Sequence, residues 1–171
     1  MQKAYQGFLI RSWQPSDRQQ VVDIARCVLE EYDMVLSPDS TDWDVIQVEQ
    51  AYWETNGTFL VVEEGGKIVG SGAYHPCDRA SKPGDQGAEL RKMFLLPHVR
   101  GQGLGGYLLT LLEQTAADNG FTEMWLETST RMQAAIKMYE RHGYYQPENA
   151  DIHIQRCDRI YVKSLLDDLN P

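Results

Sequence analysis

The sequence predicts a mixed α/β sandwich, in which helices pack on a largely antiparallel sheet. Two apolar, strand-like runs, residues 58–64 and 67–75, are joined by Gly65-Gly66, and such a two-glycine link is typical of a β-hairpin. A third run, 88–96, follows, and beyond it helical and strand-like patterns alternate. A meander that continues into β-α-β-α units indicates an α/β sandwich and disfavours a repeating doubly wound sheet.

Each predicted element rests on its own apolar spacing. The first helix places Val21, Ile24 and Val28 on one face, and the third places Leu104 and Leu108 on one face, as helices that bury one side do. The run 88–96 becomes wholly apolar toward its end, which is typical of a strand buried on both faces. The predicted order is β-α-α-β-β-β-α-β-α-β-β, with strands at 8–13, 58–64, 67–75, 88–96, 121–128, 143–146 and 158–165 and helices at 15–33, 43–53, 104–118 and 130–142.

Length, charge and composition limit the function. The 171 residues suffice for one domain, so we expect residues 1–171 to form a single domain. A net charge of −9 disfavours nucleic acid as a partner, because phosphate contacts need a basic surface. The sequence has no apolar run near the ~20 residues of a membrane span, and residues 1–13 lack the apolar core of a signal peptide. We therefore expect a cytoplasmic protein with no membrane partner.

The cysteines and histidines predict no metal site. The three cysteines, Cys27, Cys77 and Cys157, are widely spaced and form no C-x-x-C pair, which argues against zinc and against a disulfide framework. The four histidines also lack the spacing of metal ligands. A lone cysteine such as Cys157 is more often a small buried hydrophobic residue than a nucleophile.

Residues 94–114, FLLPHVRGQGLGGYLLTLLEQ, place four glycines within six residues just before a helix. The glycines Gly101, Gly103 and Gly106 satisfy G-x-G-x-x-G, and Glu127 ends the next strand where a ribose-binding acid belongs, so a dinucleotide-dependent oxidoreductase is one interpretation. Against it, four residues separate strand from loop, half of the chain precedes the loop, and little chain follows Glu127. The Gly-Lys-Ser/Thr of a P-loop is missing.

The second interpretation includes the arginine, as Arg100-x-x-Gly103-x-Gly105 at a helix N-terminus. Such a terminus offers unpaired N–H groups and the positive end of the helix dipole to an anion. Glycines let a phosphate approach those amides, because they carry no Cβ atom. Arg100 adds a positive charge nearby. This loop is therefore predicted to bind a pyrophosphate.

Two motifs carry a family resemblance. V-R-G-Q-G-L-G at 99–105 resembles motif A of the GNAT (Gcn5-related N-acetyltransferase) superfamily. A-A-I-K-M-Y-E-R-H-G-Y at 134–144 is similar to its motif B, Ala-x-x-Leu-Tyr-Glu-x-x-Gly-Phe, and the order of elements matches over essentially the whole chain. The resemblance implies the GNAT fold, with a mostly antiparallel sheet whose fourth and fifth strands run parallel and splay apart. It also implies an N-acetyltransferase that uses acetyl-CoA as co-substrate and needs no metal.

By this resemblance, acetyl-CoA lies between the strands that end at Leu96 and Thr128. The backbone of Met93, Phe94 and Leu95 would bind the pantetheine arm, because a splayed strand leaves N–H and C=O groups free. The pyrophosphate would be bound by the loop residues Arg100, Gly101, Gln102, Gly103, Leu104, Gly105 and Gly106.

The resemblance also implies the catalytic groups. Tyr139 matches the tyrosine that contacts the cofactor and acts as general acid toward the departing thiolate, and a core tyrosine is the alternative. The N–H of Leu95 is a candidate to stabilise the oxyanion. Glu89, on the same side of its strand as Arg91 and Met93, matches the place of a general base acting through water; an ordinary exposed glutamate is the alternative. Glu127 on the neighbouring strand is a weaker candidate for the base.

The implied acceptor is a primary amine of a small molecule, or of a peptide or protein, that attacks the thioester directly. The region that rims the acceptor site in this family is acidic here, which predicts a cationic amine by electrostatic steering, although a solvated acidic loop is the alternative. Its acids are Glu30, Glu31, Asp33, Asp39, Asp42 and Asp44. A non-catalytic acyl-CoA-binding regulator is a further alternative, and a homodimer is an expectation, because dimers are frequent in the superfamily.

Overall fold

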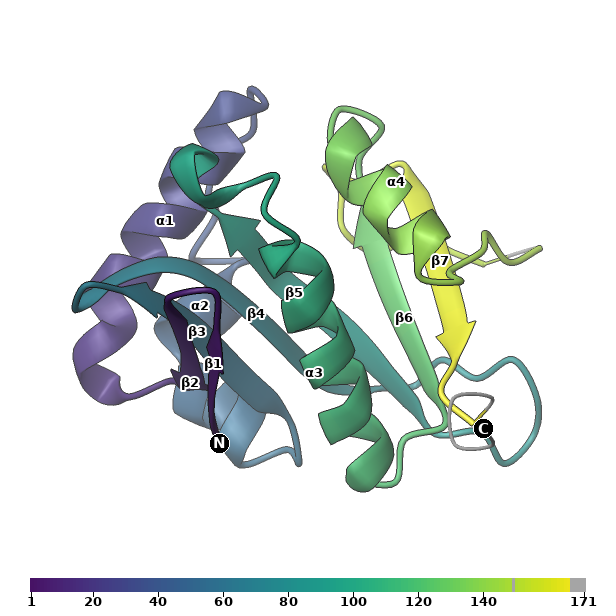
Figure 1. Ribbon diagram of the computed structural model, residues 1–171. Helices are drawn as coiled ribbons and strands as arrows, with labels where there is room; N and C mark the ends of the chain where they lie inside the picture. The colour runs from purple at the N-terminus through teal and green to yellow at the C-terminus, as the bar shows by residue number, and fades with distance from the viewer. Residues whose placement is uncertain (149, 167–171) are drawn as a thin grey trace.

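The computed structural model describes residues 1–148 and 150–166. In this part of the chain, seven strands form one sheet in sequence order, antiparallel throughout except between β5 and β6 (Figure 1). The strands are β1 (Gln2–Tyr5), β2 (Phe8–Ser12), β3 (Thr58–Glu64), β4 (Lys67–Cys77), β5 (Gly87–Leu95), β6 (Glu123–Thr128) and β7 (Arg159–Ser164). The helices are α1 (Arg18–Glu31), α2 (Trp43–Ile46), α3 (Leu104–Asp118) and α4 (Gln133–Arg141). The predicted mixed α/β class is confirmed.

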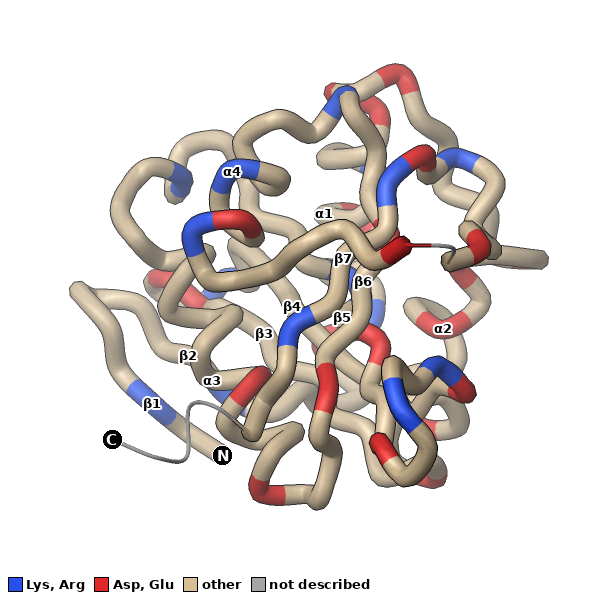
Figure 2. Tube along the Cα trace, turned by 90° about the vertical axis from the view of Figure 1, so that its right-hand side faces the viewer, with Lys and Arg blue, Asp and Glu red and all other residues tan. Residues whose placement is uncertain are grey.

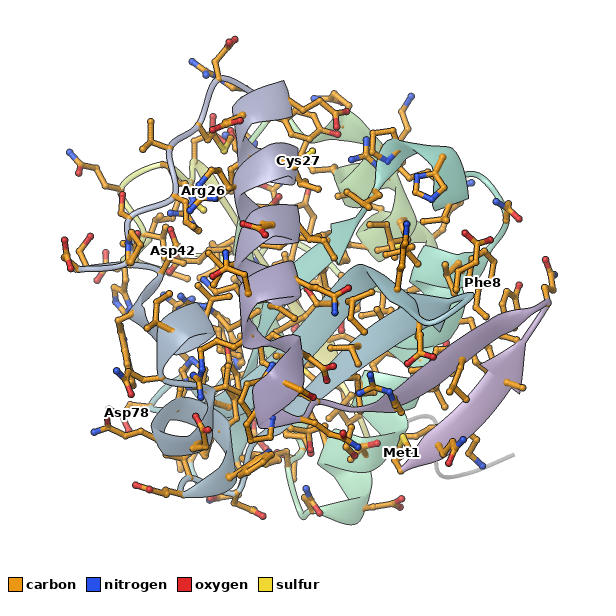
Figure 3. All side chains as sticks on the ribbon, turned by 90° about the vertical axis from the view of Figure 1, so that its left-hand side faces the viewer. Met1, Phe8, Arg26, Cys27, Asp42 and Asp78 are labelled. Atoms are coloured by element: carbon orange, nitrogen blue, oxygen red, sulfur yellow. The ribbon has the colours of Figure 1, made fainter. Side chains whose placement is uncertain are left out.

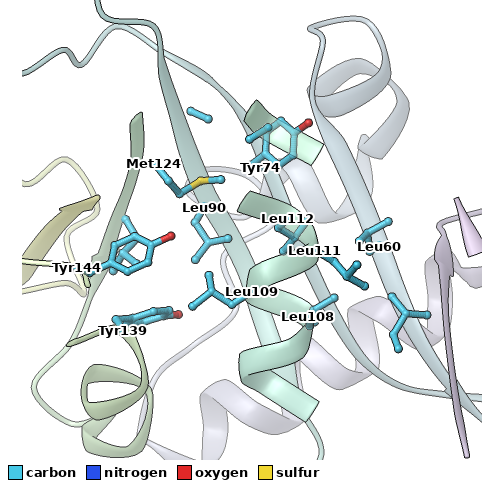
Figure 4. Close-up of a cluster of buried hydrophobic side chains, with 14 of the residues drawn as sticks. Leu60, Tyr74, Leu90, Leu108, Leu109, Leu111, Leu112, Met124, Tyr139 and Tyr144 are labelled. Atoms are coloured by element: carbon cyan, nitrogen blue, oxygen red, sulfur yellow. The ribbon is translucent and has the colours of Figure 1, made fainter. Parts of the chain in front are cut away.

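The sheet buries an apolar layer on each face. Successive side chains of a strand point to opposite faces, so Phe59 and Val61 of β3 pack with α1 while Leu60 and Val62 pack with α3. The core on the α3 side is the larger one, and Figure 4 shows Leu109 of α3 beside Tyr139 of α4. Helices α1 and α2 thus cover one face, and α3 and α4 cover the other (Figure 1).

Three local predictions were wrong. The polar segment of β1 gives no apolar signal, yet it pairs with β2 through a turn at Gln6 and Gly7, both in the left-handed region, and this hairpin carries Met1 and Phe8 in Figure 3. Residues 143–146 form no strand and contribute only a bridge between Tyr145 and Val162. Residues 43–53 form the four-residue α2 and a separate π-helical turn, Glu49–Trp53, in place of one helix.

The pairing of β5 with β6 covers three residue pairs, Gly87↔Glu123, Ala88↔Met124 and Glu89↔Trp125. Beyond them the two strands separate, as Figure 1 shows, while β5 continues along β4 and β6 continues along β7. The sheet therefore divides into a five-stranded part and a two-stranded part that are joined at one end.

Two features of the exterior bear on partners. Basic and acidic positions are interspersed along the side of the molecule that Figure 2 presents. Among the described residues, none of the helices has the length and apolar character needed to cross a bilayer.

Candidate active site

A cavity of about 70 Å³ lies in the opening between β5 and β6. Both strands, α4 and the segment 154–157 form its walls. Two of the three residues predicted to bind a pantetheine arm, Met93 and Phe94, line this cavity, as does Tyr139. Leu95 is not among the lining residues, although its backbone faces the opening, as its pairing shows.

The backbone direction of Leu95 follows from its antiparallel pairing with β4. Leu96 donates its N–H to the carbonyl of Val69 at 2.9 Å, so these two residues form a hydrogen-bonded pair. Hydrogen-bonded and non-bonded pairs alternate in an antiparallel ladder, so Leu95, opposite Gly70, directs its N–H and C=O away from β4. That direction leads toward β6, which no longer pairs with β5 at this height.

A bulge at Lys92 changes which side chains of β5 share a face. Lys92 has φ 54, and the register with β4 shifts between Ser71 and Ala73. Consequently Arg91 and Lys92 both reach Asp44, at 3.4 and 2.9 Å, although they are consecutive. The expected shared side of Glu89, Arg91 and Met93 was therefore wrong for Met93, which packs on the α3 face.

The glycine loop presents a row of unpaired amides. In the described part of the chain, no hydrogen bond is donated by the backbone amides of residues 101–106, and the first helical bond runs from Tyr107 to the carbonyl of Gly103 at 3.0 Å. Gly101 and Gly103 both have φ 77, a conformation that side chains other than glycine rarely adopt. The loop therefore has the donors that a pyrophosphate needs.

Strand β1, which the sequence did not predict, supports this loop. The ring of Tyr5 stacks on that of Tyr107 with centroids 4.3 Å apart. Its hydroxyl donates to the carbonyl of Gln102 at 3.3 Å. A Cβ atom on Gly103 would lie 2.6 Å from the same hydroxyl, so any other residue there would have to move the Tyr5 side chain from its contact with the loop.

The side chain of Arg100 is committed to protein groups. Its Nε donates to the carbonyl of Leu95 at 2.8 Å, and its two Nη atoms bind both oxygens of Glu31 on α1 at 2.6 and 2.8 Å. This bidentate contact holds the pKa of Glu31 below its usual range. Arg100 thus fixes the loop against α1, and Glu31 offsets the positive charge that the sequence led us to expect there.

Tyr139 is 6% exposed and lies on the cavity wall. Burial, with a smaller contribution from Cys157, raises the pKa of Tyr139 above its ordinary value. Its hydroxyl makes no hydrogen bond to the rest of the described chain, in contrast to Tyr52, whose hydroxyl donates to Asp44 at 2.7 Å. Tyr139 is therefore a neutral phenol with a free donor at the opening.

Glu89 is the last residue of β5 that pairs with β6, at the point where these two strands begin to separate. Its carboxylate lies 3.5 Å from Arg91 and 3.7 Å from Nε2 of His75. It does not line the cavity itself. Any proton transfer from a ligand in the cavity to Glu89 would need an intervening water.

Glu127 has a structural role. It forms an ion pair with Arg79 and accepts the backbone N–H groups of His153 and Ile154 at 2.8 and 2.7 Å. Burial opposes ionisation, but these hydrogen bonds outweigh it and lower the pKa of Glu127. Both of its oxygens already accept hydrogen bonds and its charge is paired with Arg79, which makes Glu127 a weaker candidate than Glu89 for the base.

A buried ionic cluster beside the cavity was not predicted. Asp42 has no exposed surface and accepts from Lys92 at 2.6 Å, from Arg156 at 2.7 and 2.9 Å, and from the N–H of Ser37 at 2.9 Å. Burial alone would raise the pKa of Asp42, but Arg156 and Lys92 outweigh it and lower the pKa to about 2. Figure 3 shows Asp42 on the segment that runs beside α1. No sequence spacing connects positions 42, 92 and 156, so only the fold reveals the cluster.

This cluster changes the interpretation of the acidic segment. Asp42 and Asp44 are buried and neutralised by Lys92 and by arginines, and Glu31 is paired with Arg100. The exposed acids of the segment are Glu30, Glu31, Asp33 and Asp39, and among these only Glu31 has an ion-pair partner in the described chain. The acidic rim expected from the sequence is therefore much reduced.

A second, wider cavity of about 530 Å³ adjoins the first and shares four lining residues with it. We call this cavity the vestibule; its lining residues are Asp33, Met34, Val35, Ser37, Ser40, Thr41, Ser129, Arg131, Gln155, Arg156, Cys157 and Asp158. Burial raises the pKa of the Cys157 thiol to about 11, so the thiol stays protonated near neutral pH.

Comparison with known proteins identifies the family. The model of the Acetyltransferase (GNAT) family matches residues 21–144, which include the glycine loop and Tyr139. The chain belongs to the GNAT acetyltransferase family. This membership confirms the resemblance of the two motifs and makes the protein an acetyltransferase.

Individual relatives agree with this assignment. The chain is 29% identical to an N-acetyltransferase of Escherichia coli, YjgM, over 82% of this chain and 84% of that protein. An acetyltransferase structure from Streptococcus agalactiae superposes with a TM-score of 0.79 at 29% identity, covering 94% of this chain and 99% of that one. The structure of yncA from Salmonella typhimurium, solved with its cofactor acetyl-CoA, has a TM-score of 0.69 at 20% identity and covers 93% and 94%. Mammalian relatives are longer, and the chain spans less than half of their length.

Proposed function

We propose that this GNAT acetyltransferase transfers the acetyl group of acetyl-CoA to the primary amine of a small molecule, or of a peptide or protein, by direct attack. The observation that carries the proposal is the opening between β5 and β6. Leu95 directs its N–H into this opening, because β6 no longer pairs with β5 at that point. The free amides of residues 101–106 lie beyond its end. The acetyl-CoA complex of the Salmonella protein supports the choice of co-substrate.

In this proposal the chain binds acetyl-CoA by backbone groups. Leu95, Met93 and Phe94 supply strand-like contacts to an amide-bearing arm, and residues 101–106 donate to the pyrophosphate. Bound acetyl-CoA supplies an activated thioester. The Leu95 N–H then stabilises negative charge on the carbonyl oxygen, because it already points into the opening.

Proton transfer is assigned to Tyr139 and Glu89. Tyr139 donates its phenolic proton toward the thiolate; because burial raises its pKa, it acts first as a hydrogen-bond donor, and full transfer is coupled to product release. Glu89 accepts a proton from the acceptor's ammonium group through water, which leaves a neutral amine to attack; the water is needed because Glu89 stands at the vertex of the opening and outside the cavity wall. The role of Tyr139 rests on its position and on the motif match, and that of Glu89 rests on its place on β5.

The first test is thermal unfolding with acetyl-CoA, CoA, NAD and NADP. A ligand at ~100 times its Kd stabilises by ~2.7 kcal/mol, and ~1 kcal/mol shifts Tm by about 2–4 °C at this length. We expect a shift of several degrees with acetyl-CoA and CoA alone. A shift only with NAD or NADP would favour the dinucleotide alternative, while binding of acetyl-CoA without thiol release from any amine would favour the regulatory alternative.

Three further expectations stay predictions. They are a single domain over residues 1–171, a cytoplasmic location and a homodimer. Native mass measurement tests the dimer, limited proteolysis tests the single domain, and cell fractionation tests the location.

A further inference from the structure

We propose that the acceptor is an amine that carries a carboxylate, such as a free amino acid, and that Arg131 and Arg156 of the vestibule bind this carboxylate. The inference rests on the proposed acetyl transfer and names the class of its second substrate. It replaces the cationic amine that the acidic segment suggested.

The first observation is the incomplete pairing of Arg131. Its Nη1 donates to the backbone carbonyls of Tyr32 at 3.0 Å and Asp33 at 3.2 Å, which fixes the guanidinium against the loop after α1. Its Nε and Nη2 have no partner in the described chain, and no carboxylate there forms an ion pair with it. A positioned guanidinium with its donor edge free is suited to a carboxylate, which it can bind with two parallel hydrogen bonds.

The second observation is the placement of Arg156, which lines both the vestibule and the inner cavity. Nη1 donates to Thr41 and Asp42, and Nη2 donates to Asp42, which fixes the side chain. Its Nε has no partner within the described residues. Lys92 is also paired with Asp44, so Asp42 compensates the charge of Arg156, and what Arg156 offers a ligand is its free Nε–H donor.

The other walls of the vestibule carry two carboxylates, whose charges balance those of the two arginines, and several hydroxyl groups. Both oxygens of Asp158 accept from Thr130, at 2.8 Å from its N–H and 2.7 Å from its hydroxyl, and these bonds keep the pKa of Asp158 below its usual range. Asp33 is the other carboxylate there. The remaining polar walls include four hydroxyl groups that can donate, those of Ser37, Ser40, Thr41 and Ser129.

The position of Arg156 also connects this site to the reaction. Met34, Ser129, Arg156 and Cys157 line both cavities, so the vestibule adjoins the cavity between β5 and β6. A carboxylate at Arg156 would leave the amine of the same small molecule free to extend into the opening between β5 and β6. An α-amino acid has its two groups on one carbon and so meets this requirement.

The test compares amino acids with their carboxamides, and with spermidine, as acceptors in an assay of thiol release from acetyl-CoA. Each acid and its amide differ only in the group that the vestibule would bind. We expect at least one acid to exceed its amide by roughly 10- to 100-fold in kcat/KM, the worth of hydrogen bonds to a charged group. In R131Q, KM for the acid should rise by a similar factor, while its kcat and the KM for the amide stay unchanged.

Two controls separate recognition from folding. R26Q removes an arginine whose side chain is 49% exposed on α1 and should change neither KM. R131K keeps the charge and should restore part of the preference for the acid, which a purely structural role would not do. An enzyme that prefers the amide or spermidine, or an R131Q variant with an unchanged ratio of acid to amide, would overturn the inference while leaving acetyl transfer intact.

A binding arm separates this inference from the proposed function. Binding of the same acids and amides is measured by calorimetry without acetyl-CoA, on the unmodified chain and on R131Q. Preferential binding of acids that is lost in R131Q supports the vestibule even if acetyl-CoA does not bind. Equal or absent binding of acids, together with no acid-selective turnover, refutes it.

Discussion

Replacement of Asp42 by asparagine tests the buried ionic cluster. The side chain of Asp42 has no exposed surface, and its pKa is lowered from 3.8 to about 2. Because one pKa unit corresponds to about 1.36 kcal/mol, the charged form contributes about 2 kcal/mol to stability at neutral pH. Loss of the charge also leaves Lys92 and Arg156 undercompensated, and breaking a buried pair costs about 3–5 kcal/mol. We expect D42N to lose about 2–4 kcal/mol, a fall in Tm of roughly 4–16 °C.

The pH dependence gives this prediction a distinctive sign. Asp42 has a depressed pKa in the folded state, so its contribution is present above the unfolded pKa near ~4 and is lost as pH falls through about 2. The difference between the unmodified chain and D42N, measured by urea unfolding, should therefore be constant from pH 7 to 5 and shrink from pH 4 to 2. D39N removes an exposed aspartate of the same loop and serves as the matched control. The reasoning would be refuted if D42N were as stable as D39N at pH 7, or if the stability difference between D42N and the unmodified chain did not change with pH.

Three further predictions concern the opening and the loop. G103A should weaken acetyl-CoA binding by more than tenfold in a titration, because the new Cβ would lie 2.6 Å from the Tyr5 hydroxyl. G101A has the same φ but open space around the Cβ, and it should cost only about 1 kcal/mol in stability. Equal effects of the two substitutions would contradict the steric argument. E31Q should tighten CoA binding several-fold at low salt, because it removes the carboxylate that pairs with Arg100. E30Q changes an exposed neighbouring glutamate and serves as the control. Unchanged CoA binding in E31Q would show that Arg100 does not face the phosphates. Y139F should lower kcat by roughly 10²-fold or more with little change in KM. Because the pKa of Tyr139 is raised, kcat of the unmodified enzyme should show no loss from phenol ionisation up to pH 10. An unchanged kcat in Y139F would mean that Tyr139 serves only the core.

The sequence predicted those parts of the molecule that local patterns encode. The hairpin at Gly65-Gly66, the helix after the glycine loop and the strands of the opening were found because each carries its own period or turn signal. Strand β1 was missed, since its residues, QKAY, show no apolar alternation and its contribution is a contact of Tyr5 with a loop 97 positions away. The pairing of Arg100 with Glu31 was missed for a similar reason, because the two residues meet only when α1 packs beside the loop.

The bulge at Lys92 illustrates a different limit. Alternation along a regular strand placed Glu89, Arg91 and Met93 on one side, and a left-handed residue in the middle of β5 breaks that rule. Lysine gives no signal for such a conformation, as glycine or asparagine would. The conformation accompanies the ion pairs of Lys92 with Asp42 and Asp44, which depend on the tertiary fold.

The early separation of β5 from β6 gives the middle of the sheet the character of an edge. Strand edges normally lie at the rim of a sheet, where their unpaired N–H and C=O groups can recruit another chain and promote aggregation. Here the stretch of β5 that lacks a partner on its β6 side belongs to the fifth strand from one rim, and α3 and α4 cover the face beside it. The fold thus keeps backbone groups free for a small ligand while denying them to a foreign strand.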